Sequence, residues 1–335
     1  MTLSGIASAK VNTDLLKIDV AAEAGRIESS IRDIVVNRLK RKGAVVGVSG
    51  GIDSSVVASL CTRALGKDRV IALFTPEADS SGDSLRLGRA LAAQLGIRSF
   101  LEDISPILAG IRCYERRDEA IRSVVPEYGP GYKMKIVLPG LLDATKYAIF
   151  SLVVQSPTGE TRKVRLTADA YLGILAATNC KQRARKVVEY FYADRFQYAV
   201  AGTPNRLEYD QGFFVKGGDG LADFKPIAHL YKSQVYQLAA HVGVPEEIQK
   251  RPPTTDTYSL EQSQEEFYFS LPLAKMDLCL YGKTEGIPAD QIAEAADLTV
   301  EQVERMYQQI EAKRNATSYL HSSAILVEPV AVGAD

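Results

Sequence analysis

Short apolar runs alternate with amphipathic stretches between residues 44 and 104, and this alternation constrains the fold more than any other feature of the sequence. We expect strands in the apolar runs at 44–48, 69–74 and 98–104. Helices are expected from Ser54 to Leu65 and from Ser84 to Leu95, because each stretch is followed by a glycine, a common helix end. Strands that alternate with helices over short links form right-handed βαβ units. The sequence therefore predicts an α/β fold, a doubly wound parallel sheet with flanking helices.

The alternation stops in a stretch at about 113–170. Prolines and glycines are frequent there, and two β-rich runs, KYAIFSLVVQS and ETRKVRLTA, flank a turn at 157–160. Two β-rich runs around such a turn predict a β-hairpin, so we interpret the stretch as an insertion. Beyond it we expect a helix at about 170–194, a strand at 196–202 and a C-terminal helical part at about 267–325.

The loop GVSGGIDSS, Gly47–Ser55, lies between a predicted strand end and a helix start, where ligands bind in parallel α/β sheets. Adjacent glycines let the backbone bend tightly, and a helix N-terminus favours an anion. The loop has neither the lysine of a Walker loop nor the G-x-G-x-x-G pattern. Asp53 would repel a phosphate unless a cation lay between them, so we expect bound Mg²⁺. The plainer alternative is a serine-capped helix whose early aspartate is favoured by the dipole.

Composition and charge argue against several broad classes of protein. The 335 residues include 40 Lys+Arg and 41 Asp+Glu, so the sequence predicts no broad basic face for nucleic acid. It contains no apolar run of membrane-spanning length and no signal-peptide pattern. Four scattered cysteines and three scattered histidines predict neither a disulfide framework nor a zinc site. We expect a cytoplasmic protein whose partners are small molecules, with no nucleic acid and no membrane.

The S-G-G-x-D-S pattern after a short buried strand resembles the pyrophosphate-binding loop of the ATP pyrophosphatases, which cleave ATP to AMP and pyrophosphate while adenylating a substrate. The segment AGTPNRLEYDQGFFVKGGDGLADFKPIAHLYKSQVYQLA, 201–239, narrows the resemblance to the ammonia-dependent NAD synthetases. The resemblance implies the ATP-pyrophosphatase (adenine nucleotide alpha hydrolase-like) fold, a single domain over 1–335 and a homodimer. Shorter segments that resemble the same family lie at 75–84, 178–185, 251–256 and 311–314.

The resemblance also implies a reaction and a set of site residues. ATP, as co-substrate, would activate the carboxylate of deamido-NAD as an acyl-adenylate, and ammonia would then displace AMP to give NAD. Catalytic roles fall to Asp53, Lys232 and Asp219, and Asp53 with Glu208 would hold Mg²⁺. The implied ATP-binding residues are Gly47, Val48, Ser49, Gly50, Gly51, Ile52, Asp53, Ser54, Ser55, Thr203, Lys232 and Thr254. The implied deamido-NAD-binding residues are Arg185, Lys216, Asp223 and Lys313.

Departures from the family pattern lie mainly on the acceptor side. Ala312 replaces a histidine before Lys-Arg, Thr257 replaces a leucine, and EEFY at 265–268 replaces an acidic D-E-L-G. One alternative is therefore a related ATP pyrophosphatase that adenylates and amidates a different carboxylate. Another is a non-catalytic nucleotide-binding subunit, although Asp53 together with Glu208 and Lys232 argues for catalysis. The sequence leaves no room for a glutaminase domain, so we expect free ammonia or a separate supplier.

Overall fold

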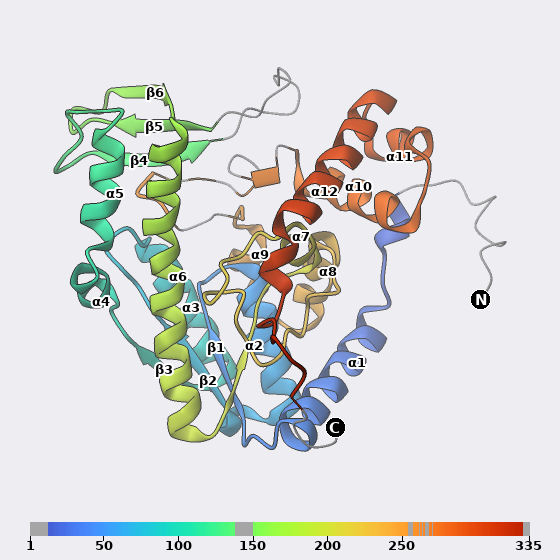
Figure 1. The fold of residues 1–335 in the computed structure, drawn as a ribbon. Helices are drawn as coiled ribbons and strands as arrows, with labels where there is room; N and C mark the ends of the chain where they lie inside the picture. Colours follow the sequence, from blue (N-terminus) through green and yellow to red (C-terminus); the bar gives the residue numbers. More distant parts are fainter. Residues whose placement is uncertain are drawn as a thin grey trace.

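A parallel sheet with the strand order β3-β2-β1-β7 forms the centre of the molecule (Figure 1). The computed structural model describes residues 13–137, 150–253, 257–260, 262, 264, 268–269 and 271–330. Within them the strands of this sheet are β1 (Ala44–Gly47), β2 (Val70–Phe74), β3 (Arg98–Leu101) and β7 (Ala199–Ala201). The arrangement confirms the predicted α/β fold with a parallel sheet and flanking helices.

Neighbouring side chains of β1 are buried on opposite faces of the sheet. Val46 belongs to a core built with α1, α2, α3 and α8, and Val45 belongs to a core built with α6. Both valines are fully buried, as expected for the middle of a parallel sheet with helices on both faces. This packing fixes both ends of the connection between β1 and α2. The covering helices are α1 (Val20–Arg32), α2 (Ile52–Leu65), α3 (Gly82–Leu95), α6 (Ala168–Phe196) and α8 (Lys232–His241).

An antiparallel sheet occupies the stretch that we interpreted as an insertion. It contains β4 (Lys133–Val137), β5 (Ser151–Gln155) and β6 (Thr161–Arg165), paired in that order. Strands β5 and β6 form the predicted hairpin. The sequence did not predict β4, nor α5 (Cys113–Arg122), which packs against α6. Figure 1 shows α6 running from this sheet down to the parallel sheet, so one long helix connects the two.

Some predicted elements end at other residues than expected. The predicted strand at 196–202 begins only at Ala199, because α6 continues to Phe196. Gln197, with φ 58°, then ends the helix in the left-handed conformation. The first helix begins at Val20, where the Asp19 carboxylate accepts two N–H groups of the first turn. The remaining short elements are η1 (Thr13–Leu16), η2 (Asp33–Arg38), η3 (Lys67–Arg69), α4 (Ser105–Gly110), α7 (Arg206–Gln211) and α9 (Glu246–Lys250).

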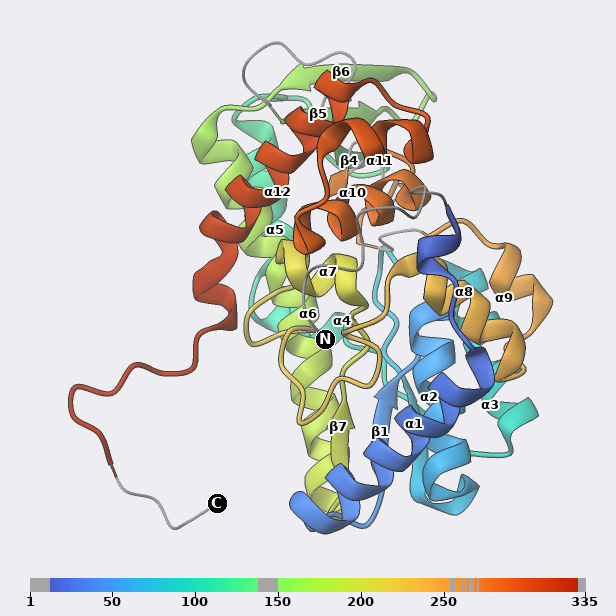
Figure 2. The same cartoon turned by 90° about the vertical axis from the view of Figure 1, so that its right-hand side faces the viewer.

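Three helices near the C-terminus supply most of a second apolar core, to which Leu16, Leu207, Tyr231 and Phe269 also contribute. The helices are α10 (Leu273–Glu285), α11 (Ala289–Ala296) and α12 (Val300–His321). Contacts of α12 with α7, and of α10 with α8, join this core to the rest of the molecule. After α12 the chain extends away from the body, as Figure 2 shows. None of the helices described for this chain has both the length and the apolar character that crossing a membrane requires.

Candidate active site

The loop between β1 and α2 is shaped by its own hydroxyl groups and by one glycine. The Ser54 hydroxyl donates to the Gly51 carbonyl at 3.1 Å and accepts from the Ser49 N–H at 3.2 Å. Gly50 has φ +74°, and a Cβ atom there would lie 2.4 Å from the Ser84 carbonyl oxygen. Only glycine therefore fits this position without displacing backbone. The loop leads directly into the N-terminus of α2, where free N–H groups and the helix dipole favour an anion.

Asp53, in the first turn of α2, forms an ion pair with a buried lysine and a hydrogen bond with an asparagine. Its Oδ2 atom pairs with Nζ of Lys232, and its Oδ1 atom accepts from Nδ2 of Asn205 at 3.1 Å. Lys232, the first residue of α8, is only 2% exposed. Burial acts to lower the pKa of Lys232, but Asp53 and Glu208 together outweigh it and the pKa is raised. The ammonium group is therefore charged and fixed beside the loop.

Glu208 adds a second carboxylate through the capping of α7. The Asn205 side chain accepts from the Glu208 N–H at 3.1 Å, and the Glu208 carboxylate accepts from the Asn205 N–H at 3.2 Å. The other carboxylate oxygen accepts from Nε2 of Gln264 at 2.9 Å. Burial and the nearby charge of Asp53 raise the pKa of Glu208 to about 7. Asp53 is thus close enough to disfavour the charged form of Glu208.

Asp53 and Glu208 have the ligand chemistry that Mg²⁺ prefers. This ion is commonly held by one or two carboxylates, with phosphate oxygens and water completing the shell. A dication between the two groups would relieve the repulsion that raises the pKa of Glu208. In the described part of the chain, no cluster of three or more His, Cys, Asp or Glu residues suits a metal ion. The pair therefore fits a metal that is shared with a phosphate ligand.

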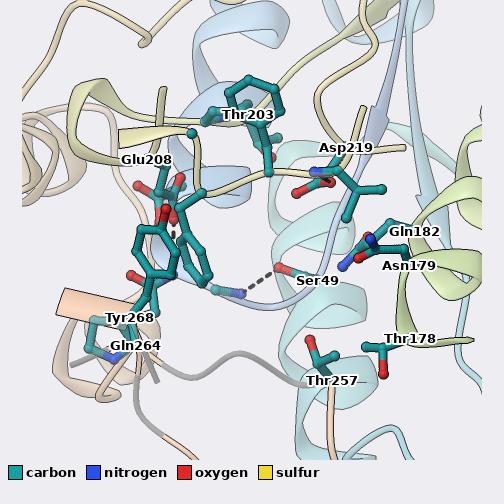
Figure 3. A pocket seen from close by; sticks show the side chains of 18 of the residues that line it. Ser49, Thr178, Asn179, Gln182, Thr203, Glu208, Asp219, Thr257, Gln264 and Tyr268 are labelled. Carbon is teal, nitrogen blue, oxygen red and sulfur yellow. Dashed lines mark hydrogen bonds between the residues drawn. The ribbon is translucent and has the colours of Figure 1, made fainter. Parts of the chain in front are cut away.

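The loop and both carboxylates line a cavity of about 480 Å³. Figure 3 shows Glu208 and Gln264 on one side of it and Asn179 of α6 on the other, with Ser49 between them. A smaller cavity of about 220 Å³ lies at the carboxyl ends of β1 and β2. Cavities of such size suit small organic ligands. Residues that line both cavities are Ser49, Ser84, Gln182, Thr203 and Asp219.

Most residues predicted to bind ATP line one cavity or both. Gly50 and Ser55 do not, but they shape the loop, and the Ser55 hydroxyl donates to the Gly51 carbonyl at 2.8 Å. Thr254 lies outside the described residues. The predicted residues that line the cavities are Gly47, Val48, Ser49, Gly51, Ile52, Asp53, Ser54, Thr203 and Lys232.

Three residues predicted for the acceptor side or for ammonia line the cavities. Arg185 lines the smaller cavity, and Lys216 and Asp219 line the larger one. The Lys216 ammonium donates to the carbonyls of Tyr319 and Ser322 at 2.7 and 3.0 Å, which brings the end of α12 to the cavity. Asp219 accepts from the Val215 N–H at 2.8 Å, and burial raises its pKa.

Asp223 and Lys313 line neither cavity. Asp223 accepts from the Val200 N–H at 2.7 Å, beside β7. Lys313 lies 4.0 Å from the centre of the Tyr268 ring and donates to the Tyr268 carbonyl at 2.7 Å, while burial lowers its pKa to about 8. Because Tyr268 lines the larger cavity, Lys313 supports that wall from behind.

Sequence reasoning missed several polar residues of the larger cavity region, among them Arg251, Asn205 and Gln264. Arg251 lines the cavity and donates to the Ser84 hydroxyl from both terminal nitrogens at 3.2 Å. Asn205 had a local signal, since asparagine followed three residues later by glutamate is a capping-box pattern. Gln264 had none, because its contact with Glu208 joins residues 56 positions apart.

Comparison with known proteins points to one family. The family model for NAD synthase matches residues 23–125 and 157–317. An NH₃-dependent NAD⁺ synthetase from Mesorhizobium japonicum is 59% identical over 96% of this chain and 100% of its own length. One from Rhizobium meliloti is 58% identical over 95% of each chain. The matched ranges contain the loop, both carboxylates and Lys232.

Solved structures share the fold at lower sequence identity. An NMN synthetase from Francisella tularensis aligns with a TM-score of 0.63 at 21% identity, covering 92% of this chain and 99% of that one. An NH₃-dependent NAD synthetase from Campylobacter jejuni aligns with a TM-score of 0.61, also at 21% identity, covering 93% and 100%. Taken with the family model and the relatives, the chain belongs to the ammonia-dependent NAD synthetase family.

Proposed function

We propose that this site adenylates the carboxylate of deamido-NAD with ATP and passes the acyl group to ammonia, which yields NAD, AMP and pyrophosphate. Ammonia-dependent NAD synthesis is the activity of the chain's family, and the proposal assigns its steps to residues. The observation that carries it is the cluster of Asp53, Lys232 and Glu208 at a phosphate-type loop. A binding protein without catalysis has no need for two carboxylates and a buried ammonium group at one anion site.

The loop residues would hold the departing pyrophosphate at the N-terminus of α2. Lys232 would stabilise the negative charge that develops there, because its ammonium group is already fixed by Asp53 and shielded from water. Asp53 and Glu208 would hold Mg²⁺, which when bound offsets charge on the phosphates. Thr203 and Thr254 would contact the nucleotide.

On the acceptor side, Arg185 and Lys216 would contact deamido-NAD directly, since both line the cavities. Asp223 and Lys313 would support the same site through their neighbours Val200 and Tyr268. Asp219 would position or deprotonate ammonia. The raised pKa of its carboxyl group supports that role, because a carboxylate of higher pKa is a better base.

We further propose that the chain is a single NAD synthetase-like domain over 1–335, that it works as a homodimer and that it acts in the cytoplasm. Exposed apolar side chains on α6 support the homodimer. The four cysteines are free thiols, which suits a reducing compartment.

The variant Asp53→Asn tests the assigned role of the carboxylate. We expect Mg²⁺-dependent pyrophosphate release to fall by about 10²–10³-fold, since a preorganised electrostatic group is lost. Circular dichroism checks that the variant still folds, because the buried Lys232 loses an ion-pair partner. The assay compares deamido-NAD with nicotinic acid mononucleotide, because one protein of this fold is described as an NMN synthetase. An unchanged rate in the variant would contradict the metal role, and a preference for the mononucleotide would contradict the acceptor.

A further inference from the structure

Lys181 connects two segments that border the cavities. Its ammonium group, on the buried side of α6, donates to Glu77 Oε1 at 2.8 Å and to Asp79 Oδ2 at 2.6 Å. It also donates to the Thr257 carbonyl at 2.9 Å. Glu77 and Asp79 lie in the loop after β2, two and four residues beyond Thr75. Thr257 belongs to a segment distant in sequence. One lysine therefore holds both segments to the same helix.

This lysine sits in a balanced network of buried charges. The Lys181 side chain is 1% exposed, and Glu77 also accepts from the Tyr114 hydroxyl at 2.8 Å. Arg117 of α5 donates to Asp79 at 2.6 Å. Removing such charges from water costs about as much as their attraction returns, so a buried ion-pair network is weak support for stability. Its clearer consequence is geometric, because it fixes where the attached segments lie.

The segment that begins at Thr257 is also attached to the inserted sheet. The N–H of Met134 in β4 donates to the Ser259 hydroxyl at 2.9 Å, and the N–H of Leu260 donates to the Met134 carbonyl at 3.1 Å. Tyr258 is buried in the apolar core that the inserted sheet shares with α5 and α6. Residues Thr257–Leu260 thus lie along the edge of β4 that does not pair with β5.

The anchored segment forms part of the cavity wall. Thr257 and Tyr258 line the larger cavity, and Gln264, shortly after them, donates to Glu208. On the other side of the network, Thr75 lines the smaller cavity. The family model leaves residues 126–156 unmatched, and these contain β4. The contribution of β4 therefore comes from a part of the chain outside the common family pattern, whereas Lys181 lies inside it.

We propose that Lys181 and the edge of β4 are positioning elements for the ATP site, because together they hold Thr257–Leu260 as its wall. The inference rests on the proposed function, since it names what keeps the nucleotide site in shape. Neither Lys181 nor Ser259 touches substrate in this role. The departure from the family pattern at Thr257 was counted with the acceptor side, but the segment leads to Gln264, which donates to Glu208 beside the loop. Loss of the anchor should therefore weaken ATP binding more than acceptor binding.

Two variants distinguish a loss of positioning at the ATP site from a general loss of folding. Ser259→Ala removes one anchor without leaving a buried charge. The double variant Glu77→Gln/Lys181→Met removes the ammonium group together with one carboxylate, so that Asp79 keeps its partner Arg117. The control is Arg112→Met, at the residue before α5, because the exposed ion pairs of Arg112 with Glu115 and Glu119 touch neither segment.

Two measurements are made on each folded variant. Hydrogen exchange of a peptide covering 257–260, followed without ligand, should quicken in both anchor variants and stay unchanged in the control. The KM for ATP should rise about tenfold in the double variant, as expected for a lost hydrogen bond to a charged group, and about threefold in Ser259→Ala. The KM for deamido-NAD should stay within about twofold.

A wild-type KM for ATP in both anchor variants, or an equal rise for both substrates, would overturn the inference. Thermal stabilisation of the wild type by Mg-ATP is measured first and tests the proposed function separately. If Mg-ATP does not stabilise the wild type, the proposed function fails and the inference fails with it. If it does, the comparison of the variants decides the inference alone.

Discussion

At the scale of single residues, Glu208 couples the site to pH. Its pKa in the folded protein is about 7, above the ordinary value of 4.5, because of burial and the charge of Asp53. Because the carboxyl pKa is higher in the folded than in the unfolded protein, the folded state holds the proton of Glu208 more tightly. The contribution of this proton to the unfolding free energy is fully present below pH 4.5 and is lost as pH rises through 7. Glu208→Gln cannot ionise and avoids this loss. We expect the metal-free variant to exceed the wild type in unfolding free energy by about 1–3 kcal/mol at pH 8.

The same comparison at pH 5 should show little of this difference, because Glu208 is then protonated in the folded wild type. Urea unfolding at both pH values measures it. Glu115→Gln, at an exposed ion pair, serves as the control and should show no such trend. A stability difference between Glu208→Gln and the wild type that is equal at pH 5 and pH 8 would show that the carboxyl group is not the cause.

The sequence predicted the position of the key residues better than their contacts. Asp53, Glu208 and Lys232 were named from motifs, and the structure brings them into one cluster because α2, α7 and α8 all begin beside the same cavity. Lys313 was also named from a motif, yet its side chain lies behind the wall. A motif fixes a residue's place in the chain, whereas the direction of its side chain depends on packing by distant segments.

At the scale of elements, the short helix α7 positions two groups through one cap. Asn205 accepts from the Glu208 N–H and donates to Asp53. Asn205→Ala should lower the unfolding free energy by about 1–2 kcal/mol and also reduce Mg-ATP-dependent turnover at least tenfold, because both carboxylates lose their support. Thr299→Ala removes the matching cap of α12, away from the site. Thr299→Ala should lower the unfolding free energy by a similar amount and leave turnover unchanged. An equal loss of turnover in both variants would contradict the positioning role of Asn205.

The predicted hairpin and the unpredicted β4 show which elements a sequence reveals. Strands β5 and β6 flank a turn at 157–160, so their pairing is local. Strand β4 pairs with β5 across residues 138–150, so no adjacent turn indicates this pairing. Helix α5 was hidden for another reason, because only Cys113 and Ile121 of its ten residues are buried. Elements held by long-range packing leave weak local signals.

At the scale of the whole molecule, α6 leaves apolar side chains in solvent although the sheet beneath it is covered. Leu172, Val187 and Phe191 are 59%, 67% and 56% exposed and lie along one side of the helix. Contiguous exposed apolar surface on a folded chain commonly marks an interface. The same helix contributes Asn179 and Gln182 to the larger cavity. Assembly through α6 would therefore act on the helix that shapes the site.

The double variant Val187→Asp/Phe191→Asp tests the proposed homodimer. Charged groups at both positions would have to be buried without partners in such an interface, which costs several kcal/mol, so we expect a monomer by light scattering at micromolar concentration. Leu101→Asp, at a 47% exposed leucine on β3, is the matched control and should keep the wild-type mass. Because α6 carries cavity residues, the monomer should also turn over deamido-NAD more slowly while Mg-ATP still stabilises it. A wild type that is itself monomeric, or a double variant that remains dimeric, would rule out this face as the interface.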